Sequence, residues 1–195
     1  CTGCTACAAA CPVNAITMKP DHEGFLRPQV GASCILCRRC EQVCPALAPQ
    51  VKGPAPDCAH AVWNNDGAVR RESTSGGFFS LLADYVVEQG GVVFGAAFDE
   101  GMTVRHIRAD TRAGLVPLRG AKYVQSDLGD TFRRVKGELE TGRLVLFSGM
   151  ACQVDGLKRY LGRSWDNLLT CDLVCNGAPS PGVFRAWLDK LEEDH

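Results

Sequence analysis

The sequence predicts two structural units: a small α+β module, followed by a larger α/β domain with a mixed, partly parallel sheet. Eight of the 12 cysteines fall within the first 44 residues, which indicates a compact cysteine-rich module at the front. From residue 73 onward, apolar runs of strand length alternate with segments of helical period, as is typical of an α/β sheet. A connector rich in proline and glycine separates the two, so the predicted boundaries are 1–48, 49–72 and 73–195.

Composition excludes several classes of protein. The chain has 195 residues, of which 46% are hydrophobic and 22% charged, so a disordered tail, a coiled coil and a collagen-like fibre are excluded. The net charge of −1 gives no support for a nucleic-acid or anionic-membrane partner. No apolar run reaches the ~18 residues of a membrane span. Because the chain starts at Cys1 and ends inside an amphipathic helical pattern, 187–195, we expect it to be a piece of a longer protein.

Two cysteine blocks repeat the same spacing, C-x2-C-x2-C-x3-C-P, and each cysteine of the second block lies 33 positions after its counterpart. Three closely spaced thiolates wrap one iron–sulfur cube, while the fourth, which precedes a proline, reaches the other cube. By this rule one [4Fe–4S] cluster is held by Cys1, Cys4, Cys7 and Cys44, and the other by Cys34, Cys37, Cys40 and Cys11.

The pattern resembles that of bacterial two-cluster ferredoxins over residues 1 to about 48, which implies a ferredoxin-like two-cluster module. Disulfides and zinc sites are poorer explanations, since neither uses four-cysteine repeats that end in Cys-Pro. Between the blocks, 15–18 and 24–27 are expected to form a hairpin over the clusters, with its turn at 21–24. Such clusters move single electrons and need a reducing compartment, so we expect a cytoplasmic protein with a redox partner.

The second domain is expected to alternate strands and helices. In chain order these are a helix opened by 73–77, strands at 91–98 and 104–109, a helix through 128–139, a strand at 143–147, a helix that follows a loop at 148–152, a strand at 168–174, and a last helix. Ser180 and Pro181 suit the N-cap and first position of that last helix. Its apolar side chains are expected to face inward, namely Val183, Phe184, Trp187 and Leu188.

Three loops, 75–77, 148–153 and 175–180, lie at helix starts or beyond strand ends, where open α/β sheets bind ligands. Neither common nucleotide fingerprint is present. Each glycine pair by itself suits a helix cap or turn as well as a ligand loop. Considered together, the later motifs form an ordered series: 73–80, 120–126, 148–153, 156–157 and 172–181.

That series, after two cysteine blocks, resembles the coenzyme F420 hydrogenase/dehydrogenase beta subunit family, in its bacterial form with a ferredoxin module at the front. The resemblance implies that the α/β domain binds FAD. It also implies that the flavin exchanges a hydride with a two-electron carrier such as F420 or with an organic substrate. The sequence reads Cys175-Asn176-Gly177 where the family usually has Cys-His-Gly. Since the family usually continues well past this endpoint, the chain looks like its amino-terminal half.

The candidate flavin-binding residues lie in these loops: Ser75, Gly76, Gly77, Lys122, Tyr123, Gln125, Ser148, Gly149, Gln153, Asn176 and Gly177. Lys122 could pair with a flavin diphosphate, or it could be a solvated surface lysine. Tyr123 could stack on the flavin or pack against the protein. Gln153 could donate a hydrogen bond to a carbonyl of the flavin ring, or it could cap its own helix. No catalytic residue is identified. A non-enzymatic alternative also fits the sequence: a ferredoxin-type electron-transfer module fused to a docking domain without flavin.

Cys152 and Cys175 each lie just past an expected strand. If those strands are parallel neighbours, the two thiols supply half the ligands of a third [4Fe–4S] cluster, completed by residues beyond the fragment. The alternative is a pair of buried thiols. Cys171 is expected in the core and His106 on a strand face.

Overall fold

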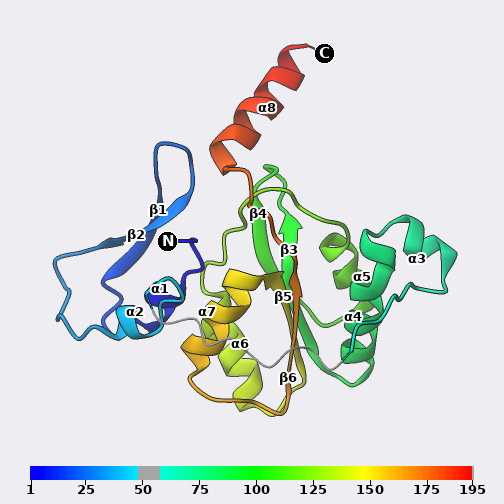
Figure 1. Cartoon of the computed structure of the whole chain (residues 1–195), viewed down its shortest axis with the longest axis horizontal. Coiled ribbons are helices and arrows are strands. Elements are labelled where there is room, and N and C mark those ends of the chain that lie inside the picture. Colours follow the sequence, from blue (N-terminus) through cyan, green and yellow to red (C-terminus); the bar gives the residue numbers. More distant parts are fainter. Residues whose placement is uncertain (48–57, 195) are drawn as a thin grey trace.

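The computed structural model describes residues 1–47 and 58–194, and the front module packs beside the α/β domain (Figure 1). The first part of the expected connector, 49–57, lies outside the described residues, as does residue 48. The described remainder of the connector contains α3 (Gly67–Arg71), which begins after Asp66. The Asp66 side chain caps that helix by accepting hydrogen bonds from the backbone N–H groups of Ala68 and Val69.

The front module holds two short helices and the expected hairpin. The helices are α1 (Ala6–Ala10) and α2 (Arg39–Gln42), and the antiparallel strands are β1 (Ile16–Pro20) and β2 (Leu26–Val30). The turn forms because Asp21 Oδ1 accepts hydrogen bonds from the backbone N–H groups of Glu23 and Phe25, at 3.1 and 2.9 Å. The hairpin prediction is confirmed, although both strands run a few residues further than expected.

The second domain is built on a four-stranded mixed sheet. Its strands are β3 (Val92–Phe98), β4 (Val104–Ala109), β5 (Val145–Met150) and β6 (Leu168–Leu173), in the order β4-β3-β5-β6. β4 pairs antiparallel with β3, whereas β3, β5 and β6 run parallel. The predicted fold class, a small α+β module followed by an α/β domain with a partly parallel sheet, is confirmed.

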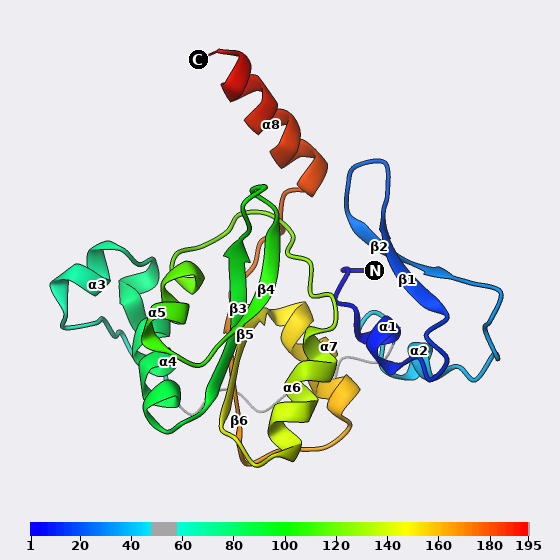
Figure 2. The same cartoon turned by 180° about the vertical axis from the view of Figure 1, so that it is seen from behind.

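Helices cover both faces of this sheet (Figures 1 and 2). One face packs against α6 (Thr131–Glu140) and α7 (Ala151–Leu161), and its core includes the fully buried Phe94, Phe132 and Phe147. The other face packs against elements that come before and between the strands: α4 (Phe78–Glu88), α5 (Arg112–Leu115) and η2 (Val116–Leu118). The short helix η1 (Ser75–Gly77) leads into α4. Burial of these apolar side chains supplies the main stabilisation of the domain.

The expected loop at 148–152 is wrong. β5 continues to Met150 and α7 begins at Ala151. The buried side chain of Gln153 accepts a hydrogen bond from the Met150 backbone N–H at 2.9 Å, so it satisfies a free donor at the helix start. Because a side chain of α7 itself caps the start of this helix, β5 and α7 join without a loop between them.

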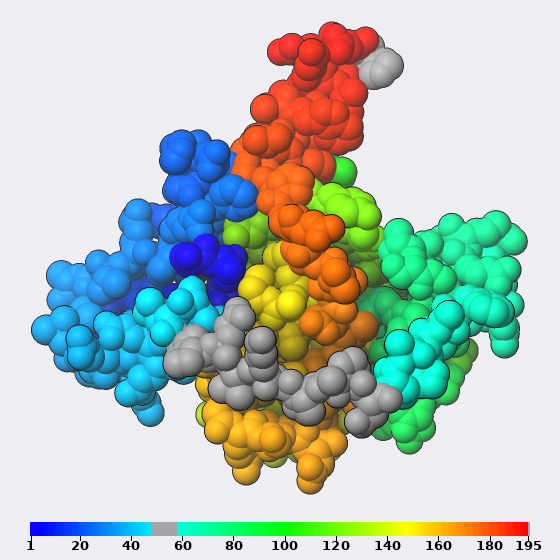
Figure 3. Space-filling model, viewed as in Figure 1, coloured from blue at the N-terminus to red at the C-terminus, as the bar shows by residue number. Residues whose placement is uncertain are grey.

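The last helix, α8 (Pro181–Glu193), projects away from the body of the molecule (Figures 1 and 3). Ser180 caps it as expected, by accepting from the backbone N–H of Val183 at 3.0 Å. The expectation that its apolar residues face inward is wrong: Val183 and Trp187 are 64% and 55% exposed. Only its first turns meet the sheet, where Phe184 stacks on Phe98. Within the described ranges, no helix is both long and apolar enough to cross a membrane.

Candidate redox and ligand sites

The first cysteine block surrounds an apolar cavity of about 280 Å³ in the front module. Five cysteines line it: Cys1, Cys4, Cys7, Cys40 and Cys44. The hairpin closes one side with Ile16, Met18, Pro28 and Val30. The cavity thus brings together three cysteines of the first block and two of the second, Cys40 and Cys44. The crossed assignment of ligands to the two clusters stays a prediction.

Two of these thiols are shielded from water. Burial raises the pKa of Cys7 to about 11 and raises the pKa of Cys4 above its usual value. Both thiols are therefore neutral at pH 7 unless a metal replaces the proton. Thr5 Oγ1 is also buried here and has no hydrogen-bond partner among the described residues, so the cavity wall keeps one polar group available to a bound group.

The second block lies closer to the surface. Cys34 and Cys37 are exposed, while Cys40 and Cys11 are half-buried. Burial opposes ionisation of Cys11, yet its pKa lies below the usual value. Two groups of contacts lower it: hydrogen bonds from the backbone N–H groups of Ala15, Val13 and Ile16, and the positive charge of Arg133. Across the described ranges, no three His, Cys, Asp or Glu side chains are close enough together to bind a single metal ion. A [4Fe–4S] cube differs from such a site because four iron atoms hold its thiolates apart.

The first block packs directly on α7. Cys4 is only 8% exposed and belongs to the same hydrophobic cluster as Val154 and Leu157. A Cβ added to Gly156 would lie 2.9 Å from Cys4 Sγ, so a glycine is required at this contact. The Cys4 thiol therefore lies against a helix of the α/β domain.

Polar contacts bind the same interface. Gln125 Oε1 accepts from the backbone N–H of Leu26 at 2.9 Å, and its Nε2 donates to the carbonyl of Thr2 at 3.2 Å. Arg133 of α6 donates to the carbonyls of Ala8 and Ala9, which end α1. These contacts make the front module and the α/β domain a single packed unit.

A larger cavity, of about 510 Å³, opens where β5 and β6 end. The ends of parallel strands are where open α/β sheets bind ligands, and the volume falls within the range of small-molecule sites. Seven of the candidate flavin residues line it: Ser75, Gly77, Lys122, Tyr123, Ser148, Gly149 and Gln153. The fold brings these loops together although they are far apart in sequence.

Four candidates do not line this cavity. Gln125 lies in the interface described above, and Asn176 and Gly177 are exposed beyond β6. Gly76 backs onto the connector, where an added Cβ would lie 2.9 Å from the carbonyl of Val62. Gly76 and Gly77 both have positive φ angles, 69° and 76°, so the backbone of this turn itself requires glycine.

Two of the lining residues have polar groups that are already used. Lys122 Nζ donates to the carbonyls of Pro117, Arg119 and Gly120, at 2.8, 2.6 and 3.1 Å, and burial lowers the pKa of Lys122 to about 8. Gln153 caps α7 and also donates to Ser126 Oγ at 2.9 Å. Both side chains therefore organise the walls of the cavity.

Three lining residues outside the candidate set have a buried polar atom that no described residue satisfies. Ser80 Oγ, His106 Nδ1 and Arg119 Nε are buried and have no hydrogen-bond partner in the described part of the chain. His106 Nε2 lies 3.0 Å from the Ser148 carbonyl, and burial lowers the pKa of His106 to about 4, so the imidazole is neutral. Arg119 could have been found from the sequence, since it lies in the same loop as the candidate Lys122. The sequence pattern around Ser80 and His106 does not indicate a ligand-binding role for either residue.

Cys152 and Cys175 lie at the same edge of the sheet. β5 and β6 are parallel neighbours, with Met150 opposite Leu173, so both cysteines follow the same rung by two residues. Cys175 is exposed, and its thiol lies 3.8 Å from Met150 Sδ. Cys152 is half-buried, near enough to Cys4 to contribute to the raised pKa of that thiol.

Comparison with protein-family models matches residues 1–48 to the 4Fe-4S dicluster domain. A search of curated proteins gave no match. The chain therefore carries an iron–sulfur electron-transfer domain at its front, packed against an α/β domain with a ligand-sized cavity.

Proposed function

We propose that the chain is an iron–sulfur flavoprotein subunit, in which two [4Fe–4S] clusters exchange electrons with an FAD held in the cavity at the ends of β5 and β6. The inner cluster is held by Cys1, Cys4, Cys7 and Cys44, and the outer cluster by Cys11, Cys34, Cys37 and Cys40. When bound, a flavin supplies interconversion of one-electron and two-electron transfer, which the clusters alone lack.

One observation carries this proposal: both sites use the same helix. Gly156 of α7 lies against Cys4, and Gln153 lines the larger cavity. The two positions are separated by three residues, which is ~4.5 Å along a helix axis. A second connection runs through Gln125, which bonds to Thr2 of the cysteine loop and precedes Ser126, a wall residue of the cavity. This proximity supports an inner cluster that serves a group in that cavity.

The residues present suit a flavin in three respects. The cavity has the volume of a cofactor site, its turn at 75–77 brings a positive-φ backbone to the wall, and it keeps orphaned polar atoms on Ser80, His106 and Arg119. His106 is neutral, so its orphaned Nδ1 is an acceptor if the proton lies on Nε2, which faces the Ser148 carbonyl. The resemblance to the F420 hydrogenase/dehydrogenase beta subunits suggests a hydride carrier of that kind, or an organic substrate, as the two-electron partner.

The flavin content of anaerobically purified protein tests this. We expect flavin to be released on denaturation in about equal amount to the chain, and apoprotein to quench the fluorescence of added FAD. Ala96 lines the cavity, so Ala96→Phe should abolish flavin binding while iron content stays unchanged. Ala186→Phe, on the exposed surface of α8, is the matched control.

A second candidate function is electron transfer without flavin, with the α/β domain as a docking platform. Internal use of the Lys122 and Gln153 polar groups favours it, because these were the strongest candidates for direct flavin contacts. No flavin in the purified protein, no binding of added FAD, and full cluster content would establish this alternative.

A further inference from the structure

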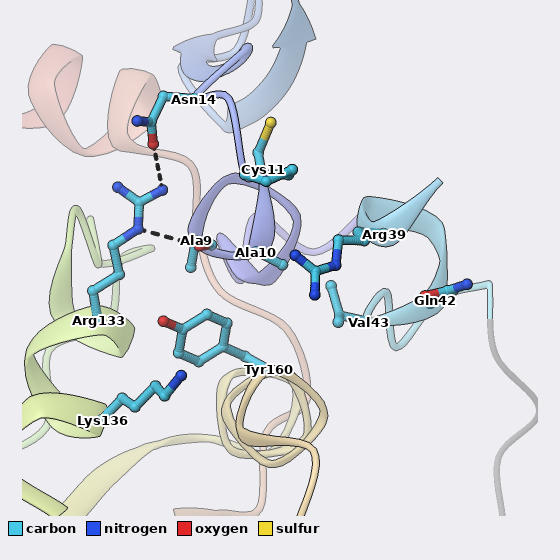
Figure 4. A pocket seen from close by; sticks show the side chains of 11 residues that line it. Ala9, Ala10, Cys11, Asn14, Arg39, Gln42, Val43, Arg133, Lys136 and Tyr160 are labelled. Carbon is cyan, nitrogen blue, oxygen red and sulfur yellow. Dashed lines mark hydrogen bonds between the residues drawn. The ribbon is translucent and has the colours of Figure 1, made fainter. Parts of the chain in front are cut away.

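A basic pocket of about 540 Å³ lies between the front module and the helices α6 and α7 (Figure 4). Three cationic side chains line it: Arg39 of α2, and Arg133 and Lys136 of α6. Tyr160 of α7 and the backbone of Cys11 complete the wall, and the Cys11 thiol points away from Arg39 and Tyr160. The pocket is thus separated from a proposed ligand of the outer cluster only by that residue's own main chain.

The charge of this pocket contrasts with that of the chain. The whole chain carries a net charge of −1, yet no acidic side chain is among the described residues that line the pocket. Arg133 is engaged with the end of α1 and with Asn14, and so serves the fold. Arg39 is exposed, and in the described part of the chain Lys136 forms one long ion pair, with Glu140 at 3.7 Å. Two cations are therefore available to a partner.

The loop that precedes Arg39 has two exposed apolar side chains. Between Cys34 and Cys37, Ile35 and Leu36 are 60% and 83% exposed. Arg38 follows them and pairs with Glu41 at 3.5 Å. We call Ile35, Leu36, Arg38, Arg39 and Lys136 the outer face. An apolar centre bordered by charge is the usual composition of a docking surface between proteins.

We propose that the outer face docks an acidic one-electron carrier protein, so that electrons enter or leave by the outer cluster while the inner cluster serves the α/β domain. This rests on the proposed function for the ligands of the outer cluster. In the reductive direction, a [4Fe–4S] cluster held by Cys11, Cys34, Cys37 and Cys40 would accept one electron, which the reduced carrier protein would supply. No bond forms and no proton is required. Opposite charges steer such encounters and accelerate association.

The test measures anaerobic reduction of the cluster-loaded chain by a reduced acidic plant-type [2Fe–2S] ferredoxin, in a stopped-flow instrument. Arg39→Glu with Lys136→Glu should slow this reaction about tenfold or more at low ionic strength. The same variant, once reduced, should donate faster than the wild type to the basic protein cytochrome c. Both differences should shrink at ~0.5 M salt, where charges are screened.

Arg71→Glu with Lys190→Glu makes the same change of net charge on α3 and α8, away from α2 (Figure 1), and should leave both rates near those of the wild type. Lys136→Glu alone, on α6, changes the outer face without altering a residue next to a cysteine. Three results would overturn the docking proposal. These are equal electron-transfer rates in all variants, slower transfer with both carriers in the outer-face variant, and equally slow transfer in the control variant. So would relief of the effect by millimolar phosphate, which would indicate a small-anion site. A wild type without iron defeats the proposed function itself, whereas full clusters with carrier-independent rates defeat only the docking face.

Discussion

Cys4 of the first cysteine block and Gly156 of α7 are in contact across the interface between the front module and the α/β domain. A Cβ at position 156 would lie 2.9 Å from Cys4 Sγ and 3.2 Å from Cys4 Cβ. Because protein interiors are close-packed, even one added methyl group here must displace a proposed cluster ligand or the helix. The contact therefore couples the proposed inner cluster site to the helix that also borders the cavity at the ends of β5 and β6.

Gly156→Ala is expected to lower the iron content and the signal of the inner cluster and to destabilise the fold by about 1–3 kcal/mol, the usual cost of overpacking. Gly137→Ala, in α6, is the control, since an added Cβ there meets nothing within 4 Å. Iron analysis and anaerobic urea unfolding measure both effects. Full inner-cluster content in the Gly156 variant would mean that the module tolerates a shift against α7.

Cys11→Ala and Cys44→Ala are expected to damage opposite clusters. The wild type should hold about eight irons. Loss of Cys11 should impair the outer cluster, built on the exposed second block, whereas loss of Cys44 should impair the inner one. Site-resolved electron paramagnetic resonance of the two variants distinguishes the clusters. The crossed assignment is wrong if each variant loses the cluster of its own block.

His106 is expected to make the folded state sensitive to acid. Its pKa is about 4 in the folded state, against the usual 6.5, because burial disfavours the charged imidazole, while the Ser148 carbonyl and Asp127 oppose the shift. Below about pH 6.5, His106 binds a proton in the unfolded chain but not in the folded chain. The free energy of unfolding should therefore fall by on the order of 3 kcal/mol as the pH drops to about 4. Above about pH 6.5 it should not change through this group.

His106→Gln should remove this dependence, and His22→Gln, in an exposed turn, should retain it. The measurement is the difference in unfolding free energy between about pH 7 and about pH 5, compared among the three proteins so that acid damage to the clusters cancels. Equal slopes for all three would show that folding does not lower the pKa of His106.

Lys122→Met is expected to destabilise the flavin-free protein by about 1–3 kcal/mol, because a half-buried ammonium loses its bonds to three carbonyls. Lys158→Met, at an exposed position of α7, should have little effect. Thermal unfolding with and without added FAD separates two roles. If stability is unchanged without FAD and only flavin affinity falls, Lys122 pairs with the cofactor and does not organise its own loop.

Cys152→Ser combined with Cys175→Ser is expected to leave about eight irons in this chain, because two thiolates cannot hold a cube that needs four. We propose a third cluster at this edge only where further cysteines complete the ligand set. Iron content of the double variant, compared with the wild type, measures this. A loss of about four irons would place these thiols in a cluster of the present chain.

The sequence determined the parts that depend on local spacing. Cysteine repeats with Cys-Pro ends predicted a 4Fe–4S dicluster domain over residues 1–48, and the family match confirms it. Alternating apolar runs predicted the parallel strands, and Ser180-Pro181 predicted the start of α8. These signals are reliable because spacing, periodicity and capping act over a few residues.

Only the tertiary structure decided which groups meet. In the structure, Cys4 contacts Gly156, and Gln125 lies in the interface between the front module and the α/β domain. The Lys122 ammonium donates to backbone carbonyls, and Trp187 of α8 is exposed. It also left polar atoms of Ser80 and His106 at the cavity without hydrogen-bond partners among the described residues. The physical reason is that hydrogen-bond partners and burial are set by surfaces that come from distant parts of the chain. A single sequence records which residues have polar groups, but the packing of those surfaces determines which of them remain available to a ligand.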